Sequence, residues 1–385
     1  MNPPIFLHSD IPDPYTIYEQ MLKENPVFYD ELHQVFICYT YRDCKTILES
    51  PLAEIPEISS EGLNEKAGRI ARELTRLSNG NQHFAAREIT VSLFRRMKYP
   101  PVESVLSEIM EKDTDHETFD FVKIVPKEFP VLFILKAFDF NKYDCDFFTE
   151  NSSVLIQIMS PGKTEAQVNI INPVAGKVYD IVKRHITSSK FLFEIVLLNT
   201  AKFTMDEDEI ISLAVSNLIG LLIQSYDAAR GLLSNAFLQY LFKNQQIFNP
   251  LPDILELKKF VLEVSRIDPA IHNTRRIAKA NIVLESCTIP QGGTMVLMLA
   301  AANRDVLHFK NARVFDDKRA NNEEQLTFGF GNHACIAKHF SINLAAEVLL
   351  YFCSKYERMT LLNARKEYEP LVNARLLKHI FISIK

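Results

Sequence analysis

The sequence predicts a mainly α-helical protein with small β-sheets near its beginning and its end. Glycine is scarce, at 11 of 385 residues, which favours helices over a loop-rich β architecture. Strand-like alternation of apolar residues occurs only in short stretches near the two ends, and helical spacing dominates between them. The chain has no internal repeat, low-complexity stretch or Gly/Ser-rich linker. We therefore expect a single domain over residues 1–385.

The N-terminal part opens with a predicted β-hairpin. Apolar residues alternate over 26–40 on both sides of a polar turn, although no Asn-Gly pair marks that turn. Residues 41–50 predict a short helix that ends before Pro51, because a residue that precedes proline disfavours the helical conformation. Further helices are expected at 82–97, 126–138 and 163–188.

A long helix is predicted from Thr204 to about residue 241. Thr204 and Glu207 match the capping-box pattern at a helix start. Residues 213–223 are apolar almost all round, so this part should be buried on several sides. The uncharged run between Glu209 and Asp227 is shorter than the about 20 residues that a membrane span needs, so we expect a core helix.

The last third of the chain alternates between short strands and helices. We expect a helix over 253–266, strands over 281–284 and 294–299 around a turn at 290–293, and a long helix after Cys335. The tail 368–385 alternates weakly and predicts a terminal hairpin. In the helix after Cys335, four apolar residues recur every fourth position and share one face: Ile336, Phe340, Leu344 and Val348.

Charge, cysteine spacing and the N-terminus exclude several classes of protein. The formal net charge of −5 argues against wholesale electrostatic capture of nucleic acid. Six scattered cysteines without a C-x-x-C pair indicate reduced thiols. The first residues lack the basic and apolar regions of a signal peptide. We expect a cytoplasmic protein that binds neither nucleic acid nor membrane.

The most informative segment is 328–337, with the sequence Phe-Gly-Phe-Gly-Asn-His-Ala-Cys-Ile-Ala. It contains two of the 11 glycines, which let a backbone turn tightly and approach a flat ligand. Cys335 stands where the loop is expected to enter a helix, and a helix N-terminus favours a thiolate over a thiol. A thiolate in an apolar loop is a strongly electron-donating axial ligand for haem iron.

Other interpretations of this segment remain open at this point. A nucleotide site is weakly supported, because no third glycine follows at the fingerprint spacing. His333, Cys335 and His339 could be zinc ligands, but no fourth ligand has a suitable spacing. An isolated cysteine before a helix can also be an ordinary buried thiol.

The segment resembles the haem loop of the cytochrome P-450 family, F-G-x-G-x-H-x-C-x-G/A, with Ala337 at the last position. The family's E-x-x-R is matched by Glu263–Arg266, which implies a buried ion pair joined by a second arginine, here Arg319. Further matches are A-A-N-R-D at 301–305, H-x-x-x-R at 83–87 and an arginine at Arg276. These ordered matches run from about residue 26 to 347 and resemble the soluble bacterial type.

This resemblance implies the fold, the cofactor and the residues that bind it. The fold is the cytochrome P-450 fold, with the long helix crossing the distal face of haem b. Cys335, at the end of the loop, would be the axial thiolate ligand of the iron. Phe328, at the start of the loop, would be among the haem-binding residues. Four cationic or hydrogen-bonding side chains would hold the two haem propionates: His83, Arg87, Arg276 and His333.

The distal helix departs from the family's pattern A-G-x-[DE]-T-[ST]. This chain has Gln224-Ser225-Tyr226-Asp227-Ala228-Ala229, so the acid is kept and the alcohol is replaced by Ala228. The alcohol normally helps to order the water that supplies protons, a general-acid role. Asp227, Gln224 and Ser225 are therefore the candidate catalytic residues. Ser225 could instead bond back to a helix carbonyl.

The resemblance implies a haem-thiolate monooxygenase that oxidises a small organic molecule with dioxygen. Electrons would come from a ferredoxin and a ferredoxin reductase, and the unusual distal helix suggests specialised biosynthesis (secondary metabolism). By analogy with the family, the candidate substrate-binding residues are Leu222, Ile223, Tyr226, Ala228, Ile271, Val372 and Asn373.

Two alternatives follow from the missing alcohol. The protein could be an atypical member that works by peroxide or by oxidative coupling, with proton delivery assisted by the substrate. It could also be a non-catalytic protein that binds haem or another ligand.

Overall fold

The structure is a computed structural model that describes residues 5–112, 117–160, 162–244, 250–362 and 365–384. The chain forms two compact units. The first unit comprises 1–54, 102–127 and 227–385, and the second comprises 55–101 and 128–226. The helix α11 (Glu207–Lys243) contributes residues to both. The single domain expected over residues 1–385 stays a prediction.

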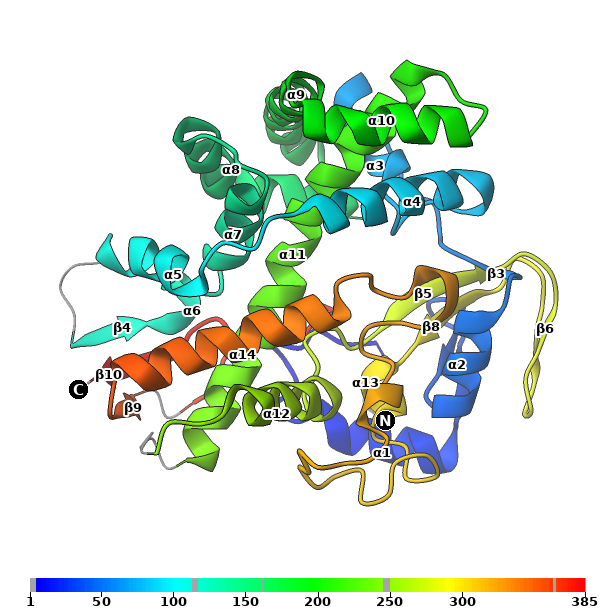
Figure 1. The fold of residues 1–385 in the computed structure, drawn as a ribbon. Coiled ribbons are helices and arrows are strands. Elements are labelled where there is room, and N and C mark those ends of the chain that lie inside the picture. The colour runs from blue at the N-terminus through cyan, green and yellow to red at the C-terminus, as the bar shows by residue number, and fades with distance from the viewer. Residues whose placement is uncertain (1–4, 113–116, 161, 245–249, 363–364, 385) are drawn as a thin grey trace. The chain divides into compact units, whose positions relative to one another are not determined.

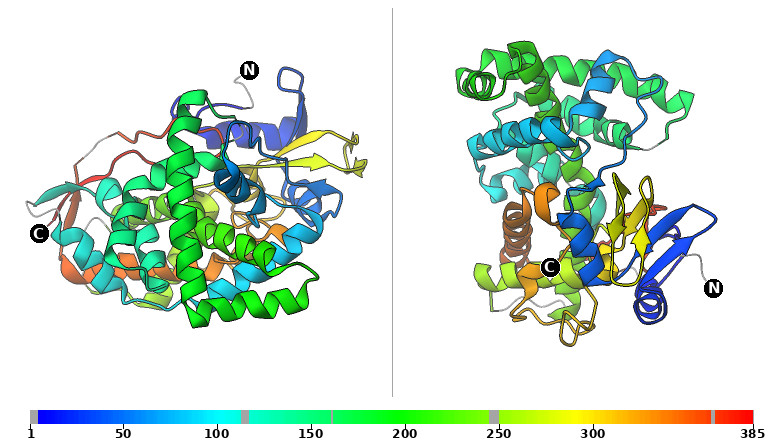
Figure 2. Two further views of the ribbon diagram at one scale, coloured as in Figure 1. Left: turned by 90° about the horizontal axis from the view of Figure 1, so that it is seen from above. Right: turned by 90° about the vertical axis from the view of Figure 1, so that its right-hand side faces the viewer.

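The first unit contains a five-stranded sheet that joins distant parts of the sequence. The hairpin β1 (Val27–Asp30) and β2 (Val35–Cys38) confirms the prediction for residues 26–40. β2 pairs in parallel with β8 (Thr294–Leu297), and Figure 2 shows these N-terminal strands beside the later ones. The sheet is completed by β5 (Thr274–Ala278) and β3 (Ala53–Glu54), in the order β1-β2-β8-β5-β3.

An apolar core lies between this sheet and the helix α2 (Tyr41–Glu49). Ile47 of α2, Ala278 of β5 and Met295 of β8 are among its buried members. Phe330, from the predicted haem loop, packs against the same cluster. The sheet core therefore supports the loop that carries Cys335.

The other elements of the first unit are helices and two smaller sheets. α12 and α14 lie side by side, as Figure 1 shows, and α14 follows the cysteine loop directly. The helices are α1 (Pro14–Glu24), α5 (Val102–Glu111), α6 (Phe121–Ile124), α12 (Ile254–Ile267), α13 (Leu299–Ala302) and α14 (Lys338–Lys355). The strands are β4 (Thr118–Asp120), β9 (Met359–Leu361) and β10 (Phe381–Ile384), which form one sheet, and the pair β6 (Ile282–Val283) and β7 (Thr288–Ile289).

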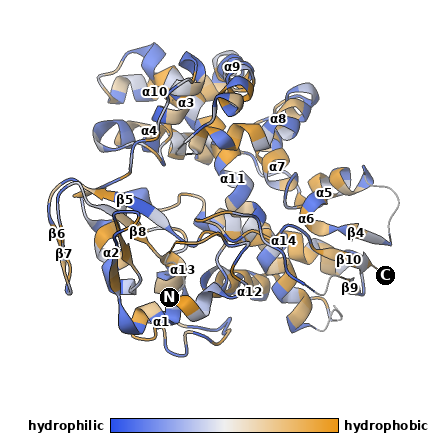
Figure 3. Ribbon diagram, turned by 180° about the vertical axis from the view of Figure 1, so that it is seen from behind, coloured by the Kyte–Doolittle hydropathy of each residue, from blue (hydrophilic) through white to orange (hydrophobic). Residues whose placement is uncertain are grey.

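The second unit is helical over the residues that the structure describes. α3 and α8 pack against α9, and α10 packs against α4 and α9. α7 carries almost only apolar residues and is buried along nearly its whole length (Figure 3). The helices are α3 (Glu65–Glu73), α4 (Gly80–Arg96), α7 (Phe129–Ala137), α8 (Lys142–Leu155), α9 (Glu165–Ser188), α10 (Lys190–Lys202) and the first part of α11.

The mainly helical class with small sheets is confirmed, whereas several boundaries differ from the predictions. α11 is capped by Asp206 and Glu209, each of which accepts a hydrogen bond from the other's backbone N–H. The predicted Thr204–Glu207 box is therefore wrong by two residues. Residues 282–283 pair with β7 and not with β8. The terminal hairpin predicted over 368–385 is confirmed in part. Tyr368 and Leu377 form an antiparallel bridge, and the N–H groups of Glu369 and Lys378 donate across it to Leu376 and Glu367. The last strand, β10, pairs with β4 and β9 instead.

Two helical segments among the described residues are long and apolar enough to cross a membrane, namely Glu207–Lys243 and Gly331–Lys355. Helices in the core of a soluble protein meet the same criterion. In the first segment, 72% of the most apolar window is buried inside the protein. This burial agrees with the core helix expected from the sequence, and the absence of a membrane contact stays a prediction.

Candidate active site

The loop from Phe328 to Cys335 is closed by its own backbone. The N–H of Cys335 donates to the carbonyl of Phe328 at 2.8 Å. Gly329 and Gly331 have φ values of +70° and +66°, in the left-handed region that side chains rarely adopt. A Cβ at position 331 would lie 2.7 Å from the carbonyl oxygen of Leu48, at the end of α2. Both glycines are therefore needed for the turn, and Gly331 is also needed for the close approach of the loop to α2.

The start of this loop is anchored to α12 through Asn303. The side-chain carbonyl of Asn303 accepts from the N–H of Leu326 at 2.7 Å, and its amide donates to Thr327 Oγ1 at 2.7 Å. Thr327 Oγ1 in turn donates to the carbonyl of Ser265 in α12 at 2.6 Å. The residue before Phe328 is thus held at a fixed place relative to α12.

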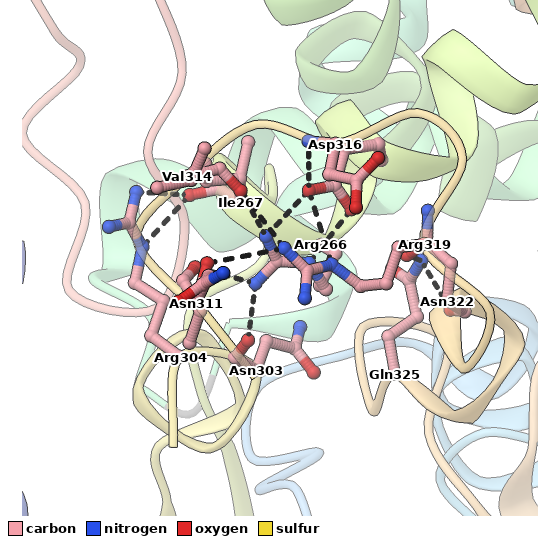
Figure 4. A network of polar contacts seen from close by, with 12 residues as sticks. Arg266, Ile267, Asn303, Arg304, Asn311, Val314, Asp316, Arg319, Asn322 and Gln325 are labelled. Carbon is pink, nitrogen blue, oxygen red and sulfur yellow. Dashed lines mark hydrogen bonds and ion pairs between the residues drawn. The ribbon is translucent and has the colours of Figure 1, made fainter. Parts of the chain in front are cut away.

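The predicted ion pair of α12 contacts the backbone of Asn303 through Arg266 (Figure 4). Glu263 and Arg266 both have 0% of their side chains exposed, and they form two hydrogen bonds of 2.6 and 2.8 Å. Arg319 joins them, with its Nε 3.5 Å from the Glu263 carboxylate. Arg266 also donates to the carbonyl of Asn303 at 2.8 Å. The buried pair and its second arginine are confirmed, and they support the residue that anchors the loop.

Cys335 differs from the other cysteines in its exposure. It is the exposed one of the six, whereas Cys38, Cys44, Cys145 and Cys353 are buried. Burial raises the pKa of the Cys38 and Cys44 thiols, and it raises the pKa of Cys353 to about 12. Cys38, Cys44 and Cys353 therefore stay protonated thiols, which makes them poor nucleophiles and poor metal ligands.

The predicted propionate-binding residues are divided between the two units. In the first unit, His333 follows the turn at Gly331 and Arg276 lies on β5 with only 4% of its surface exposed. One guanidinium nitrogen of Arg276 donates to the carbonyl of Arg275 at 2.7 Å, which orients the group. In the second unit, His83 and Arg87 stand four residues apart on α4, so they share one face of that helix.

The burial of α11 is interrupted at the predicted distal residues. Leu222 and Ile223 are buried, the residues from Gln224 to Asp227 are half-buried, and Ala228 is exposed. Burial resumes at Arg230. A core helix thus has a less covered stretch at its middle, at the position where the family pattern places the reactive face.

Gln224 and Ser225 stand where the family pattern has Ala-Gly, and both side chains turn back along α11. The hydroxyl of Ser225 donates to the carbonyl of Leu222 at 2.7 Å, which is the local bond considered in the sequence analysis. The amide nitrogen of Gln224 lies against Gly220, where an added Cβ would be 3.0 Å away. The proton of Ser225 is therefore engaged within the helix.

Three of the predicted substrate-binding residues are brought together in the first unit. Ile271 forms an antiparallel bridge with Ala374, and the N–H of His272 donates to the carbonyl of Asn373 at 2.9 Å. The side chain of Asn273 donates to the carbonyl of Val372 at 2.9 Å. These contacts hold residues 271–273 and 372–374 side by side. The other four predicted residues, Leu222, Ile223, Tyr226 and Ala228, lie on α11.

Sequence reasoning missed the residues that hold the predicted site residues in place. Asn303 was identified only as part of a motif, and Ser265 and Thr327 were not considered. Their roles depend on contacts between residues 24 to 62 positions apart, which local spacing does not encode. The one usable signal was the A-A-N-R-D match, since it pointed to Asn303.

A glycine-supported cysteine loop, anchored by a buried Glu-Arg-Arg cluster and followed by a long helix, is the arrangement of a haem-thiolate protein. The family model for cytochrome P450 matches residues 238–352. Cytochrome P450(BM-1) of Priestia megaterium is 24% identical over 344 residues, which are 84% of this chain and 82% of that protein. The biotin biosynthesis cytochrome P450 of Bacillus subtilis is 27% identical over 224 residues, which are 58% of this chain and 55% of that protein.

Solved structures show the same fold. P450BioI, in complex with an acyl carrier protein ligated to hexadec-9Z-enoic acid, has a TM-score of 0.83 at 20% identity, over 98% of this chain and 100% of that chain. Cytochrome P450 CREJ has a TM-score of 0.82 at 20% identity, over 100% of this chain and 98% of that chain. The family model and the curated relatives identify the cytochrome P450 family, and the solved structures share its fold.

Membership of this family defines the enzyme as a monooxygenase, an oxidoreductase that uses dioxygen on small molecules with haem b as its cofactor. The residues of this chain fit that group. Cys335 offers an exposed thiol at the end of a rigid loop, and Arg276 offers a nearly buried guanidinium with its orientation fixed. A thiolate is a ligand that haem iron accepts, and a guanidinium is a hydrogen-bond donor suited to the haem carboxylates.

Proposed function

We propose that this protein is a haem-thiolate monooxygenase in which Cys335 would bind the haem iron as a thiolate. When bound, the haem supplies the oxygen-activating chemistry, and the protein supplies the ligand, the pocket and the protons. Arg276 and His333, together with His83 and Arg87, would hold the two propionates, and Phe328 would be among the haem-binding residues. The observation that carries the proposal is the exposed Cys335 in a loop that is fixed by its own backbone and by Asn303.

The test is the difference spectrum of the reduced protein with carbon monoxide. We expect a strongly red-shifted Soret band in the natural protein and its loss in Cys335→Ser. Cys287→Ser is the matched control, because Cys287 is the half-buried cysteine outside the loop, and it should keep the band. A haem-replete natural protein without the red-shifted band would overturn the proposal and favour a non-catalytic binding protein.

We further propose a ferredoxin and a ferredoxin reductase as electron donors, in the cytoplasm, for a step of specialised biosynthesis. Family membership and relatives with biosynthetic names support this assignment. One structural neighbour was solved with an acyl chain on its carrier protein. Substrate screening therefore starts with free fatty acids and with carrier-bound acyl chains. Binding is read from the shift of the Soret band, and product formation with NADPH, ferredoxin and reductase tests the electron donors.

A second candidate is an atypical enzyme whose protons come from the substrate, or which uses hydrogen peroxide. Two observations favour it. Ala228 provides no hydroxyl, and the hydroxyl of Ser225 donates to Leu222. Asp227 then remains as the carboxylate of this stretch. Turnover with hydrogen peroxide and none with the ferredoxin system would support this candidate, and the reverse result would exclude it.

A further inference from the structure

A buried hydrogen-bond network in the second unit is centred on Asn217 of α11, which is 1% exposed. The Oδ1 of Asn217 accepts from the backbone N–H of Thr75 at 2.8 Å and from the hydroxyl of Thr75 at 2.7 Å. Its Nδ2 donates to the carbonyls of Glu73 and Leu213, both at 2.9 Å. Because a backbone N–H only donates and a carbonyl only accepts, these partners fix the orientation of the amide.

The same Thr75 contacts His83 through its other backbone group. The carbonyl oxygen of Thr75 lies 2.9 Å from Nδ1 of His83, whose side chain is 3% exposed. A carbonyl has no hydrogen to give, so Nδ1 must carry the proton of this bond. The contact therefore fixes the ring orientation and a proton on Nδ1. Nε2 is the nitrogen with which His83 would bind a propionate, and because a carboxylate only accepts, that bond requires a proton on Nε2 as well.

No regular secondary structure holds Thr75 at this place. α3 ends at Glu73, and Leu74 already has an extended backbone with ψ of 129°. The segment is tied to α11 instead, by Asn217 and by hydrogen bonds from Ser212 and Ser216 to the carboxylate of Glu73. Of these three residues of α11, Asn217 is the one that holds Thr75 itself.

We propose that Asn217 is a positioning residue for His83. It fixes the Thr75 peptide, and that peptide orients the His83 ring and places the proton on Nδ1. This inference rests on the proposed function only where it concerns the propionate. By this route α11, which carries the distal residues, also sets the geometry of a haem-holding side chain on α4. Partners that orient a ligating group in this way typically change binding about tenfold or more when removed.

The variant that tests this inference is Asn217→Leu, which keeps the branched shape of the side chain and removes its four hydrogen bonds. Ser216→Ala is the matched control, because it removes a neighbouring bond of the same helix, to Glu73, without touching Thr75. The first measurement is the nitrogen NMR spectrum of the histidine-labelled holoprotein in its reduced carbon monoxide form. The His83 signals are assigned by their loss in His83→Gln.

We expect the natural protein and Ser216→Ala to show a protonated Nδ1 at His83. Asn217→Leu should show a partly deprotonated Nδ1, because the Thr75 carbonyl no longer holds that proton. The second measurement is the rate of haem transfer to apomyoglobin. Asn217→Leu should accelerate this transfer about tenfold in the natural background and have little effect in His83→Ala.

Two results would overturn the inference. One is an unchanged protonation of His83 Nδ1 in Asn217→Leu. The other is an equal acceleration of haem loss with and without His83, which would show that Asn217 acts on general stability. If the protonation of Nδ1 changes as expected but His83→Ala does not accelerate haem loss, then Asn217 does position the ring, and the propionate role proposed for His83 is the part that fails.

Discussion

At the scale of single residues, Gly331 carries two separate constraints, a left-handed backbone and a missing Cβ beside Leu48. Gly331→Ala should therefore lower the haem content of the purified protein and its melting temperature. Gly292→Ala is the matched control, since Gly292 has a φ of +79° but no atom within 4 Å of the added Cβ. In the control, the free energy of unfolding should fall only by the cost of a left-handed backbone at an alanine, about 1–2 kcal/mol. Equal losses in both variants would contradict the role of the contact with Leu48.

Ala228 offers a second prediction at this scale. Ala228→Thr restores a hydroxyl on the exposed face of α11, one residue after Asp227. We expect less hydrogen peroxide to be released per NADPH consumed in the ferredoxin system, because protons would reach the site more efficiently. Product yield and peroxide are measured together. If neither changes, the loss of the alcohol is not what limits proton delivery.

At the scale of elements, α12 organises the cysteine loop through one buried charge cluster. Arg266→Met leaves the fully buried Glu263 without its bidentate partner, and we expect a loss of about 3–5 kcal/mol in the free energy of unfolding. Arg319→Met should cost less, because its Nε is 3.5 Å from the carboxylate and the pair itself is kept. Urea unfolding of both variants checks this order. A larger loss of unfolding free energy in Arg319→Met than in Arg266→Met would show that Arg319 contributes more to the stability of the cluster than Arg266 does.

How far the sequence predicts the structure also depends on the element. α4, α9 and α12 were predicted within about two residues, because their apolar spacing is local and because α9 and α12 also begin at side-chain caps. The strands β3 and β7 were missed, since two-residue strands are defined by partners elsewhere in the chain. The cap of α11 was misplaced because Thr204 and Asp206 both fit the pattern. Cys335 and its motif were recognisable from spacing alone, whereas the supporting role of Asn303 required the fold.

At the scale of the whole molecule, two buried histidines of the first unit couple stability to pH. His8 and His272 are in ring contact, with centroids 4.3 Å apart. Burial, and then the charge of Arg375, lowers the pKa of His8 from 6.5 to about 3. Burial lowers the pKa of His272 well below its usual value, and His8, Arg375 and Arg304 add to this effect. Both rings are therefore neutral in the folded protein at physiological pH.

The consequence for stability has a definite sign. Between pH 6.5 and about 3 the unfolded chain binds protons at His8 that the folded protein does not, so the free energy of unfolding falls as the pH falls. The slope is about 1.4 kcal/mol per pH unit for each such histidine. Urea unfolding between pH 7 and pH 5 should show a smaller slope in His8→Gln than in the natural protein. His339→Gln, at an exposed position, is the control and should leave the slope unchanged. An unchanged slope in His8→Gln would contradict the assignment.

The parallel pairing of β2 with β8 also has a consequence for the order in which the protein folds during its synthesis. Val35 lies opposite Thr294, so the central sheet cannot close until most of the chain has left the ribosome. The second unit, which ends at residue 226, is complete long before that point. The N-terminal hairpin must therefore wait with an unpaired strand edge while some 250 residues are added, and unpaired edges of this kind promote aggregation. Slower translation before residue 294 would prolong that interval, and the yield of soluble protein should fall accordingly.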